Sequence, residues 1–219
     1  MTTAKAYKGV AMEGLIASWY SKITLKDIHR HQLIAARMVK KIPAGGRVLE
    51  IAPGPGYFCI ELARLGPYQI TGLDISKSFV EMARKNAAAA GLQAEFRLGD
   101  AANMPFDPGT FDFAFCQAAF KNFTRPVQAI AEIYRVLRPG GVGVIVDLRS
   151  DALPSDIDRE VDGMGLGRID AVFTRWTFSA MLLKSAYSVD EMRSMVARTP
   201  FGQCKIDVSG VGFEVWLEK

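Results

Sequence analysis

Short apolar runs alternate with helical patterns along residues 47–148, and this alternation limits the fold more than any other feature of the chain. Helices are expected where apolar residues recur at helical spacing, over Tyr57–Leu65, Lys77–Ala90 and Pro126–Leu137. The predicted strands are Arg47–Ile51, Tyr68–Asp74, Gln93–Leu98, Phe111–Cys116 and Val142–Leu148. Because such alternation implies right-handed crossovers, the chain is predicted to form an α/β fold with a doubly wound, mainly parallel sheet.

The last part of the chain predicts two further strands and a reversal of direction. Residues 203–208 and 212–217 have strand patterns, and only Ser209, Gly210 and Val211 separate them. So short a connection makes an antiparallel hairpin. We therefore expect a seven-stranded sheet with a reversed last strand. Before the hairpin, Ser188 and Glu191 have the spacing of a capping box that opens a helix.

The length of 219 residues fits a single α/β domain. We predict an N-terminal helical lid at residues 1–41, in which helical spacing begins near residue 24. The cofactor-binding core is predicted at residues 42–149. A helical cap insertion is expected at residues 150–187, because this segment is strongly apolar and has few strand signals. The last helix and the terminal hairpin complete the predicted domain at residues 188–219.

The composition excludes disordered and fibrous proteins, because 49% of the residues are hydrophobic and 23% are charged. No apolar run approaches the roughly 20 residues that cross a bilayer. The first residues lack the basic stretch and apolar core of a secretion signal. The three cysteines, Cys59, Cys116 and Cys204, are too far apart for a disulfide ladder or a metal site. We therefore expect a reducing, cytoplasmic setting.

The net charge of +4 is unevenly distributed along the chain. Residues 1–41 contain eight Lys or Arg and two acids, whereas the remaining residues contain 19 basic and 21 acidic side chains. Such a basic segment can contact nucleic acid or another anionic surface. It can equally be a solvated helix face, and this interpretation is favoured because no Arg-rich run with interleaved aromatic residues is present.

Four loops follow predicted strands and could bind a ligand at the carboxyl edge of the sheet. The first, Glu50–Gly56, is rich in glycine and proline and leads into a helix, whose N-terminus favours anionic groups. Acids follow the second and third strands, at Asp74 and Asp100. The fourth loop begins at Cys116. Each loop alone is also explained by an ordinary turn or helix cap, but their order and spacing together predict an adenosine-bearing ligand.

Four motifs give the sequence a resemblance to a known family. They are Val48–Gly56, Gly72–Ser76, Gly99–Ala101 and Ala131–Gly141. In these segments the chain resembles the class I S-adenosylmethionine-dependent methyltransferases, of the small-molecule type that is similar to methyltransferase type 11. The resemblance implies a Rossmann-like methyltransferase fold, with S-adenosylmethionine as cofactor and S-adenosylhomocysteine as product.

The resemblance also implies a role for each matched residue. Glu50 and the backbone of Gly54–Gly56 would hold the methionine portion of the cofactor, Asp74 the ribose, and Asp100 with Ala101 the adenine. Further cofactor contacts are implied at Ala52, Ile75 and Gln117. Ala52 stands where the family usually has glycine, and we expect binding to survive there if its φ angle stays below zero. A dinucleotide-binding fold is not expected, because its sequence pattern requires a third glycine where this chain has Cys59.

Methyl transfer from a sulfonium is an in-line displacement, and it needs a base only if the acceptor must lose a proton. The candidate catalytic residues are His29, His31, Asp147 and Tyr20. The candidate substrate residues are Phe120, Lys121, Asn122, Arg149, Trp176 and Tyr187. All have structural explanations as well, as surface, cap or core residues. No metal is expected, because the ligands of catechol-type members have no counterpart after the fourth strand.

The predicted function is metal-independent methyl transfer to a nucleophilic O, N or S atom of a small, partly apolar acceptor. The basic N-terminal segment leaves RNA or protein as an alternative acceptor. A non-catalytic S-adenosylmethionine-binding protein is a third possibility. We expect a small-molecule partner, no nucleic acid, no membrane span, and a monomer or homodimer.

Overall fold

The computed structural model describes residues 8, 12–25, 27–165 and 167–219, except for the side chains of residues 168, 169 and 181. The parts of the predicted N-terminal lid that fall on residues 1–7, 9–11 and 26 lie outside the described residues. The sheet and the loops at its carboxyl edge are all described.

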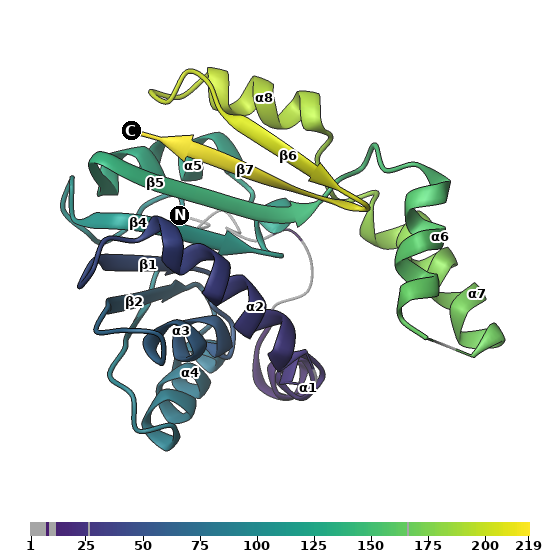
Figure 1. Ribbon diagram of the computed structural model, residues 1–219, viewed down its shortest axis with the longest axis horizontal. Helices are drawn as coiled ribbons and strands as arrows, with labels where there is room; N and C mark the ends of the chain where they lie inside the picture. Colours follow the sequence, from purple (N-terminus) through teal and green to yellow (C-terminus); the bar gives the residue numbers. More distant parts are fainter. Residues whose placement is uncertain (1–7, 9–11, 26, 166) are drawn as a thin grey trace, which may run out of the picture.

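Seven strands form one sheet in the order β3-β2-β1-β4-β5-β7-β6 (Figure 1). The strands are β1 (Arg47–Ile51), β2 (Gln69–Asp74), β3 (Glu95–Leu98), β4 (Phe111–Gln117), β5 (Leu137–Leu148), β6 (Lys205–Ser209) and β7 (Gly212–Glu218). Strands β1 to β5 pair in parallel, whereas β7 is antiparallel to both β5 and β6. The predicted doubly wound sheet with a reversed last strand is confirmed.

One strand begins earlier than the sequence predicts. We expected a turn at residues 138–141 and a strand from Val142, but β5 begins at Leu137, which pairs with Phe111. The pairing of β4 with β5 shifts register between Phe111 and Phe113, and this shift accommodates residues 138–141. Gly140 has a φ of 77°, which a residue with a side chain rarely adopts.

Eight α-helices are present in the described part of the chain. They are α1 (Gly14–Leu25), α2 (Ile28–Met38), α3 (Tyr57–Ala63), α4 (Lys77–Ala89), α5 (Pro126–Val136), α6 (Pro154–Gly163), α7 (Arg168–Thr177) and α8 (Val189–Ala197). All of these lie in segments that the sequence predicted to be helical, although helical spacing in residues 1–41 was recognised only from about residue 24. Ser76 and Ser188 cap α4 and α8, since each hydroxyl accepts a hydrogen bond from a backbone N–H of the first turn.

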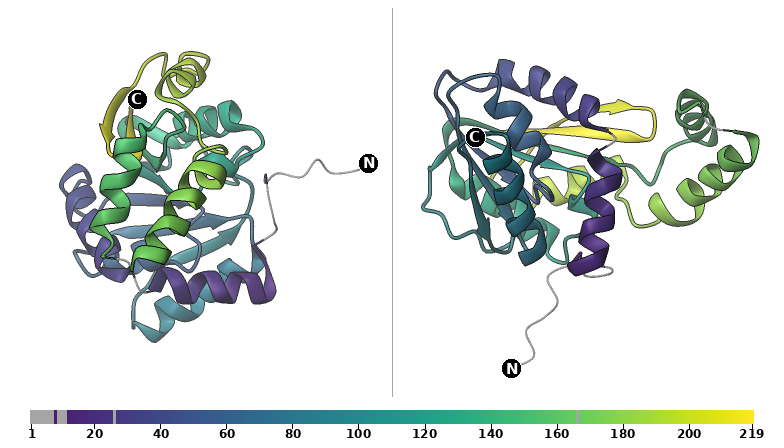
Figure 2. Two further views of the ribbon diagram at one scale, coloured as in Figure 1. Left: turned by 90° about the vertical axis from the view of Figure 1, so that its right-hand side faces the viewer. Right: turned by 90° about the horizontal axis from the view of Figure 1, so that it is seen from below.

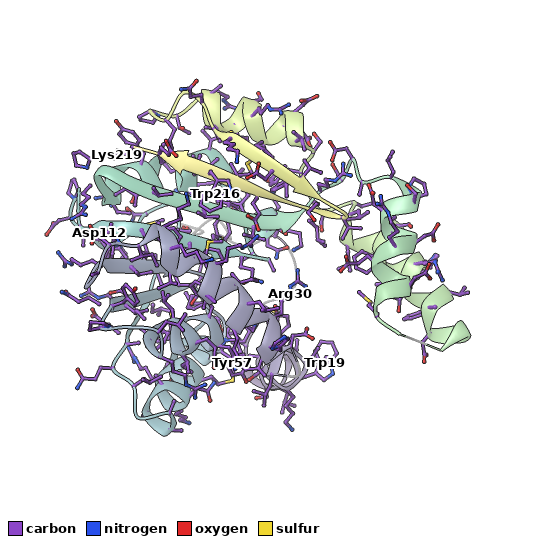
Figure 3. The ribbon with its side chains drawn as sticks, in the orientation of Figure 1. Trp19, Arg30, Tyr57, Asp112, Trp216 and Lys219 are labelled. Carbon is purple, nitrogen blue, oxygen red and sulfur yellow. The ribbon has the colours of Figure 1, made fainter. Side chains whose placement is uncertain are left out.

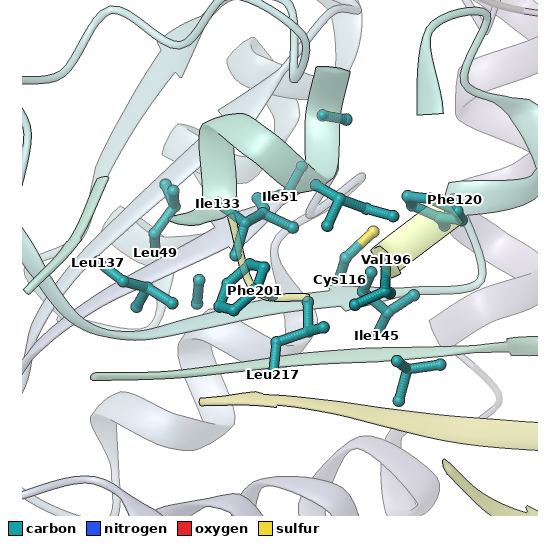
Figure 4. Close-up of a cluster of buried hydrophobic side chains, with 14 of the residues drawn as sticks. Leu49, Ile51, Cys116, Phe120, Ile133, Leu137, Ile145, Val196, Phe201 and Leu217 are labelled. Carbon is teal, nitrogen blue, oxygen red and sulfur yellow. The ribbon is translucent and has the colours of Figure 1, made fainter. Parts of the chain in front are cut away.

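Buried side chains cover both faces of the sheet. One apolar cluster joins the sheet to α5 and α8, and Figure 4 shows part of it around Leu49, Ile133 and Val196. A second cluster joins the opposite face to α2, α3 and α4 through Val48, Phe58 and other residues. Since successive side chains of a strand point to opposite faces, Val48 and Glu50 lie on the α3 side of β1.

The segment between β5 and α8 forms the helix pair α6 and α7, which stands beside the carboxyl edge of the sheet (Figures 1 and 2). A small apolar cluster that includes Ile157, Phe178 and Val211 joins this pair to the β6–β7 turn. Arg149 fixes the same junction, because its guanidinium donates to Gly210 O and to the Asp156 carboxylate. None of the described helices is both long enough and apolar enough to cross a membrane.

The ion pair of the buried Glu132 and the half-buried Arg135 ties the loop after β3 to α5. The Glu132 carboxylate accepts from Met104 N at 2.7 Å and from Arg135, which also donates to the carbonyls of Met104 and Phe106. The hydrogen bonds from Arg135 and Met104 outweigh the effect of burial and lower the pKa of Glu132. This carboxylate therefore stabilises the fold in its ionised form.

We expect Glu132→Gln to lower the free energy of unfolding by about 1–2 kcal/mol at pH 7, because the charged acceptor is lost. Because folding lowers the pKa of Glu132, the ionised carboxylate stabilises the protein at pH values above its pKa in the unfolded chain. The difference in free energy of unfolding between Glu132→Gln and the native chain should therefore shrink as the pH falls through the folded-state pKa of Glu132. Urea unfolding at several pH values measures this. Glu95→Gln is the matched control, because its pair with Arg97 is exposed and should contribute less than about 0.5 kcal/mol.

Candidate functional site

The candidate site lies where the order of strands reverses, at the carboxyl ends of β1, β2 and β4. In the sheet register, Ile51 of β1 pairs with Leu73 of β2 on one side and with Cys116 of β4 on the other. The loops that follow these three strands are therefore neighbours. Ligands of open α/β sheets bind at this place.

The loop after β1 has an unusual backbone. Ala52, Gly54 and Gly56 have φ angles of 57°, 54° and 81°, all in the left-handed region. A Cβ atom at Gly56 would come within 2.9 Å of Ala83 Cβ, so the missing side chain lets α4 pack against the loop. An added Cβ at Gly54 would meet no atom within 4 Å, so open space borders this glycine.

The backbone of Ala52 has a conformation that we did not expect. We expected cofactor binding to tolerate the alanine if its φ stayed below zero, but its φ is positive. The left-handed conformation costs an L-residue about 1–2 kcal/mol. A hydrogen bond from Ala52 N to Leu73 O, at 2.7 Å, helps to hold the residue in this conformation. Ala118, directly after β4, is also left-handed, with a φ of 54°.

Asp74 joins two loops through its buried carboxylate. One oxygen accepts from Gly54 N at 3.0 Å and the other from Ser76 N at 2.9 Å. Burial raises the pKa of Asp74 to about 6, although the hydrogen bonds from Ser76 and Gly54 lower it. Since Ser76 is the residue that caps α4, Asp74 is not needed as a helix cap. Its carboxylate keeps further acceptor capacity, because a carboxylate has about four lone-pair directions.

Glu50 is buried on the α3 side of the sheet. Its carboxylate accepts a hydrogen bond from the Cys59 thiol at 2.8 Å. Burial is the main cause that raises the pKa of Glu50 to about 7, with a smaller contribution from the charge of Asp74. The sequence singled out Cys59 only as a missing glycine, and no sequence pattern indicated that its thiol would contact Glu50.

Asp100 lies at the third strand end and makes two contacts. One carboxylate oxygen accepts from Ala102 N at 2.8 Å, and the other pairs with Arg125 at 2.6 Å. A surface hollow of about 550 Å³ lies next to this pair, and its lining includes Asn103, Arg125 and Val127. Ile75 is exposed at the end of β2, beside Asp74. The predicted adenine-binding and ribose-binding residues thus follow adjacent strands of the sheet.

Lys121 and Asp147 form a nearly buried ion pair at the ends of β4 and β5. Their side chains are 12% and 2% exposed, and Lys121 Nζ lies 2.9 Å from Asp147 Oδ1. Asp147 also accepts from the backbone N–H groups of Lys121 and Leu148. Lys121 is the ion-pair partner of Asp147, whereas the nearby Arg149 pairs with Asp156. With both oxygens engaged, Asp147 is poorly placed to take a proton from a substrate.

The helices α1 and α2 lie beside these loops. The Tyr20 ring packs 5.8 Å from Phe79, and burial together with the negative charges of Asp147 and Asp74 raises the pKa of Tyr20. Tyr57, the first residue of α3, has its hydroxyl 3.0 Å from Ser21 Oγ of α1. Figure 3 shows Tyr57 below the sheet, next to α1.

The two histidines differ in their environment. His29 is exposed, whereas His31 packs 6.1 Å from the Tyr57 ring, and its buried Nδ1 has no hydrogen-bond partner among the described residues. Burial lowers the pKa of His31, and the charge of Arg30 lowers it further. The charges of Asp27 and Glu61 act in the opposite direction and only partly offset these effects.

The substrate candidates fall into two groups. Phe120, Asn122 and Tyr187 lie close together, because the Phe120 and Tyr187 rings are 5.9 Å apart and Lys8 contacts both Asn122 O and the Tyr187 hydroxyl. Arg149 instead fixes the helix pair, as described above. Trp176 is exposed on α7 and contacts Phe173, with 6.0 Å between the rings.

Two features of the site had no signal in the sequence. Glu13 accepts from the N–H groups of Lys77 and Ser78 at the start of α4, so the segment before α1 is fastened beside Asp74. The Ser21–Tyr57 contact fastens α1 itself. Both depend on packing between distant segments. Among the residues whose placement is described, no group of His, Cys, Asp or Glu could hold a metal ion.

Comparison with known proteins agrees with this geometry. Residues 49–145 match the model of a methyltransferase domain family. A candidate S-adenosyl-L-methionine-dependent methyltransferase from Methanococcus maripaludis has a solved structure that covers 100% of this chain, with a TM-score of 0.78 and 21% identity, and this likeness shows the fold. Over these residues the chain is thus similar to a methyltransferase domain. The matched methyltransferase domain contains Glu50, the glycine loop, Asp74 and Asp100.

Two curated relatives share this domain. The chain is 39% identical to a demethylmenaquinone methyltransferase of Deinococcus radiodurans over 102 residues, which are 46% of this chain and 42% of that protein. It is 33% identical to a ubiquinone/menaquinone biosynthesis C-methyltransferase of Roseobacter denitrificans over 149 residues, 64% of this chain and 60% of that protein. The chain thus spans about half the length of the curated relatives that it matches.

We expect Ala52→Gly to raise the free energy of unfolding by up to about 1 kcal/mol, because it relieves a left-handed residue with a side chain. Urea denaturation measures the effect. Ala88→Gly, on the exposed side of α4, is the matched control and should lower stability by about 1 kcal/mol. A similar loss in both variants would show that Ala52 is not strained.

The raised pKa of Glu50 predicts a pH-dependent effect of Glu50→Gln. A carboxyl group whose pKa is raised by folding stabilises the folded protein at pH values below its pKa in the unfolded chain. For Glu50 this stabilisation is lost as the pH rises through about 7. The free energy of unfolding of the variant, minus that of the native chain, should therefore rise by about 1–3 kcal/mol between pH 5 and pH 8. Chemical unfolding at both pH values tests this. A difference that stays constant with pH would mean that Glu50 titrates normally.

Proposed function

We propose that this protein is an S-adenosylmethionine-dependent methyltransferase that acts on a small, partly apolar acceptor without a metal ion. The observation that carries the proposal is the buried Asp74 carboxylate, which lies against the glycine loop at the reversal of strand order. A carboxylate at this place can accept hydrogen bonds from ribose hydroxyls. The match of residues 49–145 to a methyltransferase domain supports the same reading.

The residues present fit such a cofactor. Asp74 keeps free lone pairs for ribose hydroxyls, and the open space at Gly54 leaves room for a ligand beside the loop. Asp100 and Ala101 would hold the adenine, with Ile75 beside them, and Glu50, Ala52, Gly54 and Gly56 would hold the methionine portion. The cofactor supplies an electrophilic methyl group on a sulfonium. Gln117 at the end of β4 completes the proposed set.

The acceptor would lie between the ends of β4 and β5 and the N-terminal helices. Phe120 and Tyr187 supply aromatic surface there, and Asn122 supplies polar groups. For an acceptor that must lose a proton, His31 is a candidate base, since its Nδ1 has no hydrogen-bond partner among the described residues. The proposed acceptor atom is O, N or S, and the name of the Roseobacter denitrificans relative, a C-methyltransferase, adds carbon as a fourth case.

The wider setting is also part of the proposal. We propose a single domain over residues 1–219, with residues 1–41 as lid and residues 150–187 as cap, that works as a monomer or homodimer. The free thiols of Cys59, Cys116 and Cys204 are consistent with the reducing cytoplasm. Exclusion of water by the lid and the cap would protect the sulfonium.

We expect calorimetry to detect binding of S-adenosylmethionine and S-adenosylhomocysteine but not of NADH. Asp74→Asn should weaken binding by about 1–3 kcal/mol, because a ribose hydroxyl loses a charged acceptor. Asp207→Asn is the matched control, since Asp207 is exposed on β6 and pairs with the exposed Lys205. Circular dichroism confirms that each variant is folded. Equal affinity of Asp74→Asn and the native chain would remove Asp74 from the site.

Turnover separates the three classes of function. We expect methyl transfer to phenols, thiols, amines or reduced naphthoquinones, with no loss of rate in EDTA. Turnover on RNA or protein alone, with steep loss of binding at high salt, would overturn the small-molecule acceptor. Cofactor binding without turnover on any acceptor would identify a non-catalytic binding protein.

A further inference from the structure

Glu50 is an acidic side chain that is buried without a cation beside it. The residue is 4% exposed, and no positive charge among the described residues contributes to its pKa. Its neighbours across the sheet are Gly72 of β2, which has no side chain, and the apolar Phe115 of β4. Buried acids in proteins are normally paired or hydrogen-bonded. The few partners of Glu50 therefore decide what its carboxylate can bind.

The thiol of Cys59 is the side-chain donor to this carboxylate. Cys59 lies in the first turn of α3, which packs against this face of the sheet (Figure 1). The residue is fully buried, and its Sγ atom lies 2.8 Å from Glu50 Oε2. A buried cysteine ordinarily acts as a small apolar residue, so direct contact with a carboxylate is an unusual use of the thiol.

The two oxygens of Glu50 differ in their surroundings. Oε2 accepts from the thiol, whereas Oε1 has no hydrogen-bond partner among the described residues. In the part of the chain that the structure describes, fully buried polar side-chain atoms without a partner occur only in His31, Asp112 and Trp216. Oε1 of Glu50 is therefore not fully enclosed. The loop that follows Glu50 borders open space at Gly54, so a ligand there is close to this oxygen.

The charge of Glu50 depends on the contact with Cys59. Burial raises the pKa of Glu50 to about 7, whereas hydrogen bonds from the thiol and the backbone of Cys59 lower it. The charge of Asp74, on β2, raises it further. Glu50 in turn raises the pKa of Cys116, on β4. The thiol thus stabilises the ionised carboxylate at a place where its other neighbours favour the protonated form.

We propose that Cys59 is a positioning residue, which holds Glu50 with Oε2 on the thiol and leaves Oε1 to accept from the ammonium group of the cofactor's methionine portion. This inference rests on the proposed function, because it concerns the cofactor named there. An ammonium group has three donors and carries a positive charge, which suits a buried carboxylate without a cation of its own. Without the thiol, Glu50 loses the donor that fixes its orientation and favours its ionised form.

The experiment compares two ligands that differ in the ammonium group. S-adenosylhomocysteine has the amino-acid portion, whereas methylthioadenosine has the same nucleoside and thioether without it. Calorimetry measures both affinities for the native full-length chain, Cys59→Ala and Cys59→Ser. At pH 7, Cys59→Ala should weaken binding of S-adenosylhomocysteine about five- to tenfold and that of methylthioadenosine less than about twofold, because only the first ligand reaches Glu50. Cys59→Ser keeps an O–H donor and should restore most of the lost affinity.

The pH dependence of the two affinities is a second readout. Both ligands would contact Asp74 through the ribose, so the ratio of the affinities removes the effect of its titration. This ratio should fall as the pH decreases through about 7, because protonation of Glu50 removes the charge that attracts the ammonium group. In Cys59→Ala the pKa of Glu50 rises, so the midpoint of the fall should move up by about one pH unit. Cys59→Ser should return the midpoint, whereas a loss of packing alone would not move it.

Cys204→Ala is the matched control, because it makes the same change at a half-buried thiol directly before β6 and should leave both affinities unchanged. Circular dichroism verifies the fold of each variant. The positioning role is overturned if Cys59→Ala binds S-adenosylhomocysteine as the native chain does, or if it loses affinity equally for both ligands. A native chain that binds the two ligands equally well at every pH also overturns it. Binding of neither ligand to the native chain would instead overturn the proposed function, and this inference with it.

Discussion

The carboxyl edge of the sheet depends on the buried Asp74 carboxylate. It accepts one backbone N–H from the loop after β1 and one from the start of α4, so a single side chain sets the distance between two loops. Ser76, which donates one of these bonds, also caps α4 and binds the carbonyl of Met12. The N-terminal helices are thus positioned through the same few atoms. Burial of this carboxylate is unfavourable by itself, as its raised pKa indicates, and the backbone donors only partly offset the cost.

Strain and buried charge are concentrated at this edge. Two alanines, Ala52 and Ala118, have left-handed backbones at the ends of adjacent strands. Glu50 and the Lys121–Asp147 pair are buried within the same region. Stability alone would favour glycine at the two backbone positions and apolar residues at the buried ones. Such unfavourable choices are typical of functional sites, where geometry matters more than stability.

The sequence predicted the sheet well, because strand alternation and glycine loops are local patterns. It placed Glu50, Asp74 and Asp100 at neighbouring strand ends for the same reason. Residues 1–41 were expected to be helical, but helical spacing was recognised only from about residue 24, so α1 had no sequence pattern of its own. The partners of Cys59, Asp147 and Arg149 were also missed. These contacts join residues that are distant in sequence or depend on a rotamer, and neither is encoded in a short pattern.

The insertion of β7 between β5 and β6 has a consequence for the order of assembly. β7 follows all the other strands in the chain, yet it lies inside the sheet, where it supplies the partner of β5 on one side and of β6 on the other. During synthesis, one edge of β5 therefore remains unpaired until β7 has been made, and β6 also lacks its partner strand until then. Contacts between segments so distant in sequence form slowly. A growing chain of this topology completes its sheet in one late step. Until then, the unpaired edge of β5 is exposed and can bind chaperones or pair with other nascent chains.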